Sequence, residues 1–556
     1  MTERVVWPAV PRDPGVWAGG PPVGPGGSSA PRMAPPILPP PPASGDSNGA
    51  RPAQPAPESG SVDQAGRQVA WPTLAPPPPS MDPGLRGNQL PDRAPSWVLA
   101  LSVLVLAAVV IGGAYIMVSR ESDHPDRWDD RVAPLAAWAA EARGLEFEHP
   151  VYVNFLTEAE YTAATTSEAP ESEEESTEID DVVAQIRALG LVSGEVDLTE
   201  SVNTLSDSGT LAFYQPSDKQ IYVKGTELTP AVKVTLVHEL VHVLQDQHFD
   251  LKRQGDEEED PHTTLRAVAE GDAGRIENTY ITEELSAEER EDYERESAEQ
   301  GEDAVDEVTS SVPDGLTAVF TAPYVFGEPF VAIVAEADGN SGVDRALENP
   351  PSTRVLFDPR LWDTDEEEDV AVEVVVPSGV EEIESDRLGS PMLYLVLAAR
   401  IPHQDAMDAT DQVAGERFVS YRDGTRVCVR ATARGRDSER SARVEAAFQR
   451  WAQASPEGMA TVSRDANGAV QLQSCDPGPD VDTSSVSLDA LALPVTRSSL
   501  YAAILQQGGN EKQAACVVDA VVPSLTPAEL RVESEEAASA VQGRVIGAMG
   551  MCMAAS

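Results

Sequence analysis

Basic residues, histidines and cysteines are all scarce in this chain of 556 residues. Forty Lys and Arg stand against 93 Asp and Glu, so the formal net charge is −53. The excess of acid lies beyond residue 118, which argues against nucleic acid or an anionic membrane surface as a partner of that part. A chain of this length has room for two or three globular domains. We find no internal repeat and no signal of an oligomeric state.

The first 96 residues lack lysine and clusters of apolar residues, but they hold 24 of the 46 prolines. Such a segment cannot offset its ordering entropy, so we expect a disordered tail with polyproline II character. Residues 97–118 follow without a single charge, with Trp97 and Tyr115 towards the ends of the run. This length spans a bilayer core of about 30 Å as a helix. A cleaved signal peptide would be shorter and nearer the N-terminus, so we expect a single-pass membrane protein.

The cysteines indicate the orientation in the cell membrane, because arginines flank the apolar run on both sides and the positive-inside rule does not decide. All four lie beyond the run, and none belongs to a C-x-x-C pair. They suit two disulfides in an oxidising compartment, most simply Cys428–Cys475 and Cys516–Cys552, although four cysteines allow three pairings. We therefore expect the N-terminal tail in the cytoplasm and residues 119–556 outside. Four reduced cysteines in a cytosolic domain are the alternative.

The part beyond the apolar run mixes helical and strand patterns. Helices are expected at 132–144, 229–247, 263–282, about 285–300, 390–400, 438–454 and through the last seventy residues. We expect a strand at 150–156, and hairpins at 211–225 and around 422–424. The acidic run 165–181 is expected to be a solvated loop, and the segments beyond about residue 313 are mixed in pattern.

The stretch "VHELVHVLQDQHFDL" (237–251) carries the clearest chemistry. His238 and His242 are four residues apart, so they share one helix face and can bind one zinc ion. Glu239 lies about 100° round the helix from His238, where it suits a general base acting on a zinc-bound water. The rest of this helix is apolar nearly all round, so its polar side chains need partners or a metal. We expect a zinc site, and histidines held by hydrogen bonds alone are the alternative.

Two residues compete to be the third ligand. His248 completes the spacing of the metzincin pattern H-E-x-x-H-x-x-G-x-x-H, but Gln245 stands where the glycine lets the chain leave the helix. Metzincins also need a methionine turn, and the next methionine after the motif is Met392. Glu270, in a second helix with an apolar stripe, is the alternative ligand and the one we favour, although a solvated Glu270 is also consistent with the pattern. His262 is a weaker candidate.

At these residues the chain resembles a family of bacterial and archaeal zinc metallopeptidases of the gluzincin type. The likeness rests on "HELVHVLQDQHFDL" (238–251) and "AVAEGDA" (267–273). It extends to "FYQPSDKQIYVKG", "PYVFGEPF" and "NPPSTRVLFDP", and so covers roughly 145–430. The resemblance implies zinc held by His238, His242 and Glu270, with Glu239 as general base. It also implies a peptide or protein substrate outside the membrane and makes Asp272 a candidate second-layer residue.

The expected fold class is α+β. Its predicted parts are a disordered tail (1–96), a transmembrane helix (97–118), a linker (119–131), a zincin-like metallopeptidase domain (132–380), an α+β extension (381–480) and a helical C-terminal segment (481–556). A further interpretation is that the cysteine-containing region at about 380–556 is a binding module, which would bring the metal site to a target.

One departure from the family concerns residues 352–359, "STRVLFDP", where relatives typically read Ser-Thr-Glu-Gln-x-Leu-His-Pro. Arg354 and Asp358 stand in place of the glutamate and the histidine. The alternative to a peptidase is therefore a catalytically inactive, zinc-binding envelope protein that acts as a binding scaffold. Tyr280 and Tyr324 are the candidates for stabilising the oxyanion of an active enzyme.

Overall fold

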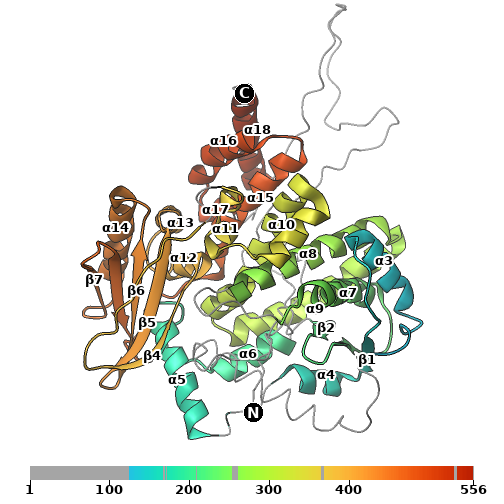
Figure 1. Ribbon diagram of the computed structural model, residues 1–556, viewed down its shortest axis with the longest axis horizontal. Coiled ribbons are helices and arrows are strands. Elements are labelled where there is room, and N and C mark those ends of the chain that lie inside the picture. The colour runs from blue at the N-terminus through green and yellow to red at the C-terminus, as the bar shows by residue number, and fades with distance from the viewer. Residues whose placement is uncertain are drawn as a thin grey trace, which may run out of the picture.

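The computed structural model describes residues 124–166, 170, 172–207, 210–252, 261–364, 368–481, 483–530 and 535–554. The predicted tail (1–96), the predicted transmembrane helix (97–118) and the first residues of the linker lie outside this part. The described chain is a mixed α+β protein with two small sheets and many helices, as the sequence predicts (Figure 1). The finer assignment to a zincin fold stays a prediction.

The first half of the described chain combines a small sheet with helices. Its elements are α3 (Ala133–Arg143), β1 (Tyr152–Leu156), α4 (Glu158–Thr165), α5 (Glu173–Ala188), α6 (Leu198–Asp207), β2 (Ala212–Gln215), β3 (Gln220–Lys224), α7 (Pro230–Phe249), α8 (Pro261–Glu283), α9 (Ala287–Ser311) and α10 (Asp314–Glu348). In this sheet β3 lies between β1, which is parallel to it, and the antiparallel β2. The predicted helices at 132–144, 229–247 and 263–282, the strand and the first hairpin are confirmed.

Helix α7 carries the histidine motif and begins as its sequence predicts. The Thr229 side chain accepts a hydrogen bond from the Val232 amide, and Pro230 takes the first helical position. The helix continues through Gln245 and stops only at Asp250, whose φ of 49° is left-handed. The chain therefore does not turn at Gln245, where a metzincin would.

The prediction of a solvated loop over 165–181 is wrong for its second half, which belongs to α5. Ser172 and Glu175 form a capping box at the start of this helix, and acidic residues in a first turn are favoured by the helix dipole. The apolar end of α5, with Val182 and Ile186, is buried in the core. The run of acidic residues therefore begins a helix whose later turns pack against the second sheet, at β6 (Arg426–Arg434) and β8 (Val470–Cys475).

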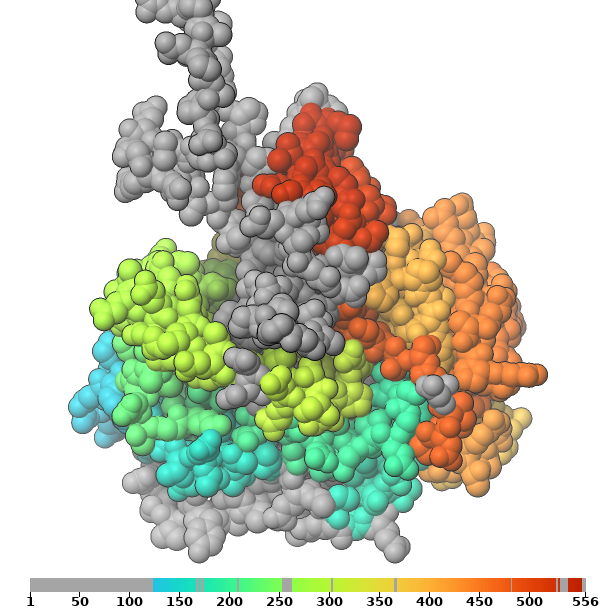
Figure 2. All heavy atoms as spheres, turned by 180° about the vertical axis from the view of Figure 1, so that it is seen from behind, coloured from blue at the N-terminus to red at the C-terminus, as the bar shows by residue number. Residues whose placement is uncertain are grey.

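The second half builds a larger sheet and a helical end. Its elements are α11 (Thr353–Phe357), η1 (Pro359–Leu361), β4 (Glu381–Asp386), α12 (Ser390–Ala398), α13 (His403–Thr410), β5 (Gly415–Asp423), β6 (Arg426–Arg434), α14 (Ser438–Ala454), β7 (Ala460–Arg464), β8 (Val470–Cys475), η2 (Leu488–Leu491), α15 (Ala492–Gln506), α16 (Glu511–Val521), η3 (Val522–Ser524), α17 (Pro527–Leu530) and α18 (Glu535–Ala554). The sheet is antiparallel, in the order β4-β5-β6-β8-β7. Seen from behind, the blue residues that begin the described chain and the orange second sheet lie at opposite ends of the molecule (Figure 2).

Helix α10 runs through the middle of the molecule, between α8 and α15 (Figure 1). It continues through Pro323 and Pro329 and kinks at Gly339. One continuous core reaches from α5 to α18, and so it crosses the predicted domain boundaries near residues 380 and 480. Those boundaries stay a prediction.

Two described helical stretches are long and apolar enough to cross a membrane, namely α10 and Leu488–Gln506. In each of them 72% of the apolar window is buried inside the protein, which is how a core helix of a soluble domain is buried. The single-pass topology, with its span at 97–118, stays a prediction.

The cysteines form two disulfides, Cys428–Cys475 and Cys516–Cys552, as the simplest pairing predicts. The first joins directly opposed residues of β6 and β8, and the second joins α16 to α18. Cys428, Cys475 and Cys552 are buried, whereas Cys516 is exposed. The disulfides support the expectation that this part of the chain matures in an oxidising compartment.

Replacing both Cys516 and Cys552 with serine is expected to lower the free energy of unfolding by up to about 4 kcal/mol, because the bond closes a loop of 36 residues. Denaturant melts measure the effect, and serine in place of the exposed neighbour Met551 is the control. Thiol titration of the unfolded wild-type protein should find no thiol before reduction and four after it. Reactive thiols in the unreduced protein would contradict both pairings.

Candidate metal centre

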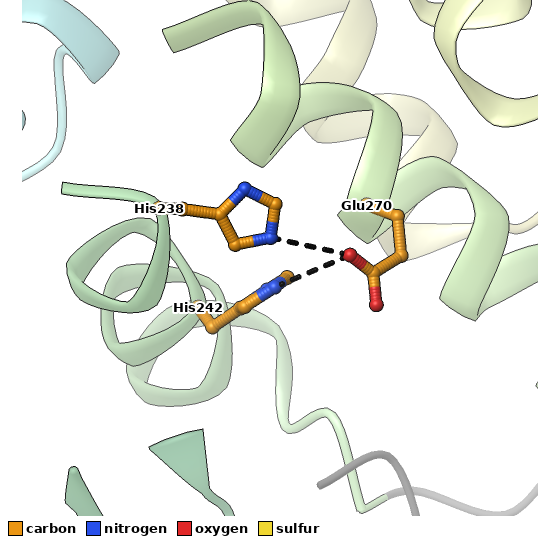
Figure 3. Close-up of side chains that lie close together, drawn as sticks. All are labelled: His238, His242 and Glu270. Atoms are coloured by element: carbon orange, nitrogen blue, oxygen red, sulfur yellow. Dashed lines mark hydrogen bonds and ion pairs between the residues drawn. The ribbon is translucent and has the colours of Figure 1, made fainter. Parts of the chain in front are cut away.

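Three buried side chains converge between α7 and α8 (Figure 3). Glu270 Oε2 lies 3.2 Å from His238 Nε2 and 3.5 Å from His242 Nε2. The three residues are between 0% and 3% exposed. Metal bonds of about 2.0–2.1 Å at a tetrahedral angle place ligand atoms about 3.3 Å apart. The three donors therefore have the spacing of a metal site, and α8 supplies the carboxylate that the sequence favours over His248.

Each histidine is oriented by an acceptor at its other ring nitrogen. Nδ1 of His238 lies 2.8 Å from Glu277 Oε2, and Nδ1 of His242 lies 2.8 Å from Gln245 Oε1. The amide nitrogen of Gln245 donates to Ala269 O and to Asp272, so its oxygen is the atom left to face the histidine. Both Nδ1 atoms are thus set as donors. This is how protein sites orient imidazoles that bind metal through Nε2.

This arrangement fits a cation. With Nδ1 protonated on each ring, the two neutral Nε2 atoms direct lone pairs at the Glu270 carboxylate. Three electron-rich atoms facing one another need either a bound cation or two protonated imidazoles. Burial alone would raise the pKa of Glu270, but hydrogen bonds and charge from His238 and His242 outweigh it and hold that pKa below its ordinary value. The His238, His242 and Glu270 group can therefore hold a metal ion, with two nitrogens and one oxygen as donors.

Glu239, the expected general base, is held by the strand next to its helix. Its Oε2 accepts a hydrogen bond of 2.8 Å from the backbone amide of Tyr214 in β2. The phenol of the same tyrosine donates to Asp246, two turns further along α7. Tyr214 thus joins the edge strand β2 to α7 at two points. The Tyr214 amide, at the edge of the sheet, is therefore occupied by Glu239.

The polar end of α7 is attached to the chain that follows α3. Gln247 accepts from the Glu148 amide and donates to the His149 carbonyl, and His248 donates to the Glu146 carbonyl. His248 is therefore not a third ligand. His262 lies in the first turn of α8, which begins two residues before the predicted helix at 263–282. Its side chain is outside the described part of the structure.

Arg266 forms an ion pair with the ligand candidate Glu270. It lies one turn before Glu270, with Nε 3.9 Å from Glu270 Oε1, and it donates to the phenol oxygen of Tyr324. The other tyrosine candidate, Tyr280, packs edge-on against Trp138 at a centroid distance of 4.9 Å. Of the two, Tyr324 is the one joined to the ligand group, and its link passes through Arg266.

The close approach of α10 to α8 is what brings Tyr324 beside the ligand helix. A Cβ at Gly271 would lie 2.4 Å from the Gly327 carbonyl oxygen, and a Cβ at Gly327 would lie 1.9 Å from the Ala267 carbonyl oxygen. Only glycine allows this contact.

The close contact of α10 with α8 also places the partly buried Glu328 near Glu277. Burial, and to a smaller extent the charge of Glu277, raises the pKa of Glu328 to about 8.

The raised pKa gives the metal-free protein a pH dependence. Glu328 keeps its proton in the folded state up to about pH 8, whereas the unfolded chain loses it near pH 4.5, so stability should fall as the pH rises from 4.5 to 8. Replacing Glu328 with glutamine should remove this loss and stabilise the protein at pH 8 by on the order of a few kcal/mol. Melts with a chelator present measure it, with Glu336→Gln on the exposed side of α10 as control. Parallel pH profiles for the wild type and Glu328→Gln would contradict it.

The two residues that depart from the family pattern make structural contacts. Arg354 donates to the Val413 carbonyl and lies 3.5 Å from Asp369. Asp358 accepts two hydrogen bonds from Arg360, at 2.7 and 2.8 Å. The contacts of Arg354 join α11 to the segments that precede β4 and β5, and those of Asp358 stabilise the turn between α11 and η1. The departures therefore have a role in packing, whatever the activity of the site.

The sequence pattern indicates the ligands but not their supports. Gln245 could have been found, because it lies one turn after His242 and faces the same side. Glu277 lies two turns after Glu270 on the same face, and only the crossing of α7 and α8 pairs it with His238. Arg143, which bonds Asp272 at 2.6 Å, lies 129 residues away and leaves no local signal.

Comparison with known proteins adds no family to this geometry. No protein-family model matches the chain, and no match is found among curated proteins or solved structures.

Proposed function

We propose that the chain is a membrane-anchored, extracytoplasmic zinc metallopeptidase of the gluzincin type. The observation that carries the proposal is the buried group of His238, His242 and Glu270, in which both imidazoles are oriented through Nδ1 and Glu239 follows the first ligand directly. A nitrogen-rich donor set with a single carboxylate suits zinc better than magnesium or calcium. The apolar run at 97–118 and the two disulfides support the anchored, external location.

In this proposal each residue has a separate task. His238, His242 and Glu270 hold the ion, which when bound lowers the pKa of a coordinated water and polarises the scissile carbonyl. Glu239 takes the proton from the attacking water and passes it to the leaving amine. Arg266 and Tyr324, joined to each other beside Glu270, supply a positive charge and a phenol near the ligands.

The deciding experiment uses the full chain purified in detergent, with elemental analysis and a broad peptide library. One zinc per chain and peptide cleavage that a chelator abolishes and zinc restores are the expected results. A protein without stoichiometric metal would refute the proposal.

A second candidate is a zinc-binding scaffold that cleaves nothing. It is favoured by the burial of all three ligands and by the structural contacts of Arg354 and Asp358, which stand where relatives carry other residues. In this case the same experiment finds stoichiometric zinc without turnover of any peptide.

A further inference from the structure

The support of His242 continues beyond Gln245 to a helix outside both motifs. Asp272 is fully buried, and its Oδ2 accepts hydrogen bonds from Gln245 Nε2 at 3.0 Å and from Arg143 Nε at 2.6 Å. Arg143 is the last residue of α3 and is itself fully buried. Its Nη2 bonds Asp344 in the last part of α10, at 2.5 Å. The Arg143 guanidinium thus joins α3, α8 and α10, and it is linked to His242 through Asp272 and Gln245.

The end of α3 is fixed in place by further contacts. Asn340 donates to the Arg143 carbonyl at 2.6 Å, and its amide lies 3.1 Å from where a Cβ would sit on Gly144. The residues that follow, Glu146 to His149, are hydrogen-bonded to Gln247 and His248 on the last turn of α7. The guanidinium therefore has a defined position relative to the zinc helix.

We propose that Arg143 is a positioning residue of the metal centre and sets its affinity for the ion without touching a ligand. The inference rests on the proposed metal site, but not on peptidase activity. Arg143 holds the Asp272 carboxylate in position, because its Nε bonds the same Oδ2 that accepts from Gln245 Nε2.

The orientation of the Gln245 amide links Arg143 to the ligand His242. With Asp272 as an acceptor, Gln245 must turn its oxygen to Nδ1 of His242. Without Arg143, Oδ2 of Asp272 loses a donor, and the carboxylate can turn from Gln245 towards Arg275, which bonds its Oδ1 at 2.8 Å. The Gln245 amide then loses one of its two acceptors and keeps only the Ala269 carbonyl, so the acceptor of His242 is held less firmly. Loss of such outer partners typically costs 10–100-fold in metal affinity.

The test compares zinc dissociation constants of the full chain, measured by competition with a chelator, for Arg143→Met, Arg143→Lys and Arg187→Met. Arg187 is also buried and bonds the Asp476 carboxylate through two nitrogens, so its loss removes a comparable ion pair away from the ligands. We expect 10–100-fold weaker zinc binding in Arg143→Met and an unchanged constant in Arg187→Met. With Co²⁺ in place of zinc, the visible spectrum should change only in the Arg143 variants.

Arg143→Lys is the second variant, for the case in which Arg143→Met does not fold. If Arg143→Met does not fold, Arg143→Lys decides, because lysine keeps the charge but cannot hold Asp272 and Asp344 in one planar fork. Zinc binding at least threefold weaker in this variant supports the proposal. Constants within twofold of wild type in the folded Arg143 variants overturn it, with the metal site intact. A wild-type protein that binds no metal removes the proposed function and this inference together.

Discussion

Replacing Glu239 with glutamine should lower peptide cleavage by a factor of about 10²–10⁴, which is what general-base catalysis contributes. Zinc content should not change, because Glu239 is not one of the three converging donors. The fold should persist as well, since a glutamine oxygen can still accept the hydrogen bond from the Tyr214 amide. The measurement is kcat/KM on a peptide that the wild type cleaves, with zinc quantified in both proteins.

Asp246→Asn is the matched control for this experiment. Asp246 is a buried carboxylate on the same helix and is held by the phenol of the same tyrosine. Its replacement changes the same chemical group two turns away, so we expect less than a tenfold change in kcat/KM. Undiminished cleavage by Glu239→Gln would exclude the general-base role, and equal losses in both variants would show that only the packing of α7 matters.

Loss of the third ligand is the second large effect that we expect. Zinc at 100 times its dissociation constant stabilises a folded protein by about 2.7 kcal/mol. If Glu270→Gln weakens binding by 100-fold, the same zinc concentration stabilises the variant by only about 0.4 kcal/mol. Thermal melts with and without a chelator measure both values. The shift in Tm on adding zinc should therefore nearly disappear in Glu270→Gln.

His248→Ala and His262→Ala are the controls that decide between the candidate ligands. His248 donates to the Glu146 carbonyl at the exposed end of α7, so its replacement should leave the zinc-dependent Tm shift intact. We expect the same for His262. A zinc shift that survives in Glu270→Gln and disappears in His248→Ala would reverse the assignment of the third ligand.

The resemblance to gluzincins is carried by short stretches, and the structure shows how these stretches work together. In "LQDQH", Gln245 supports His242, Asp246 bonds Tyr214, and Gln247 and His248 hold the chain after α3. The residues after the two histidines therefore attach α7 to its surroundings. The helix continues through Gln245, a good helix former that stands where a metzincin has glycine.

The amino-acid sequence was sufficient for several features that depend on near neighbours. The spacing of His238 and His242, the cap at Thr229 and the first hairpin follow from helix and strand periods and from turn residues. The same local reasoning was wrong for the acidic run at 165–181. The second half of this run begins α5, and the apolar residues of this helix come after the run and pack against the second sheet.

Only the tertiary structure decided which distant side chains support the site. Glu270 could be proposed from its helix, but its approach to both histidines depends on how α7 crosses α8. The place of Tyr324 depends on the contact between Gly271 and Gly327, which lets α10 approach α8. Arg143 reaches Asp272 only because α3 packs behind both helices. Helix periods act over a few residues, whereas these contacts depend on packing between helices far apart in the chain, and no local pattern encodes that packing.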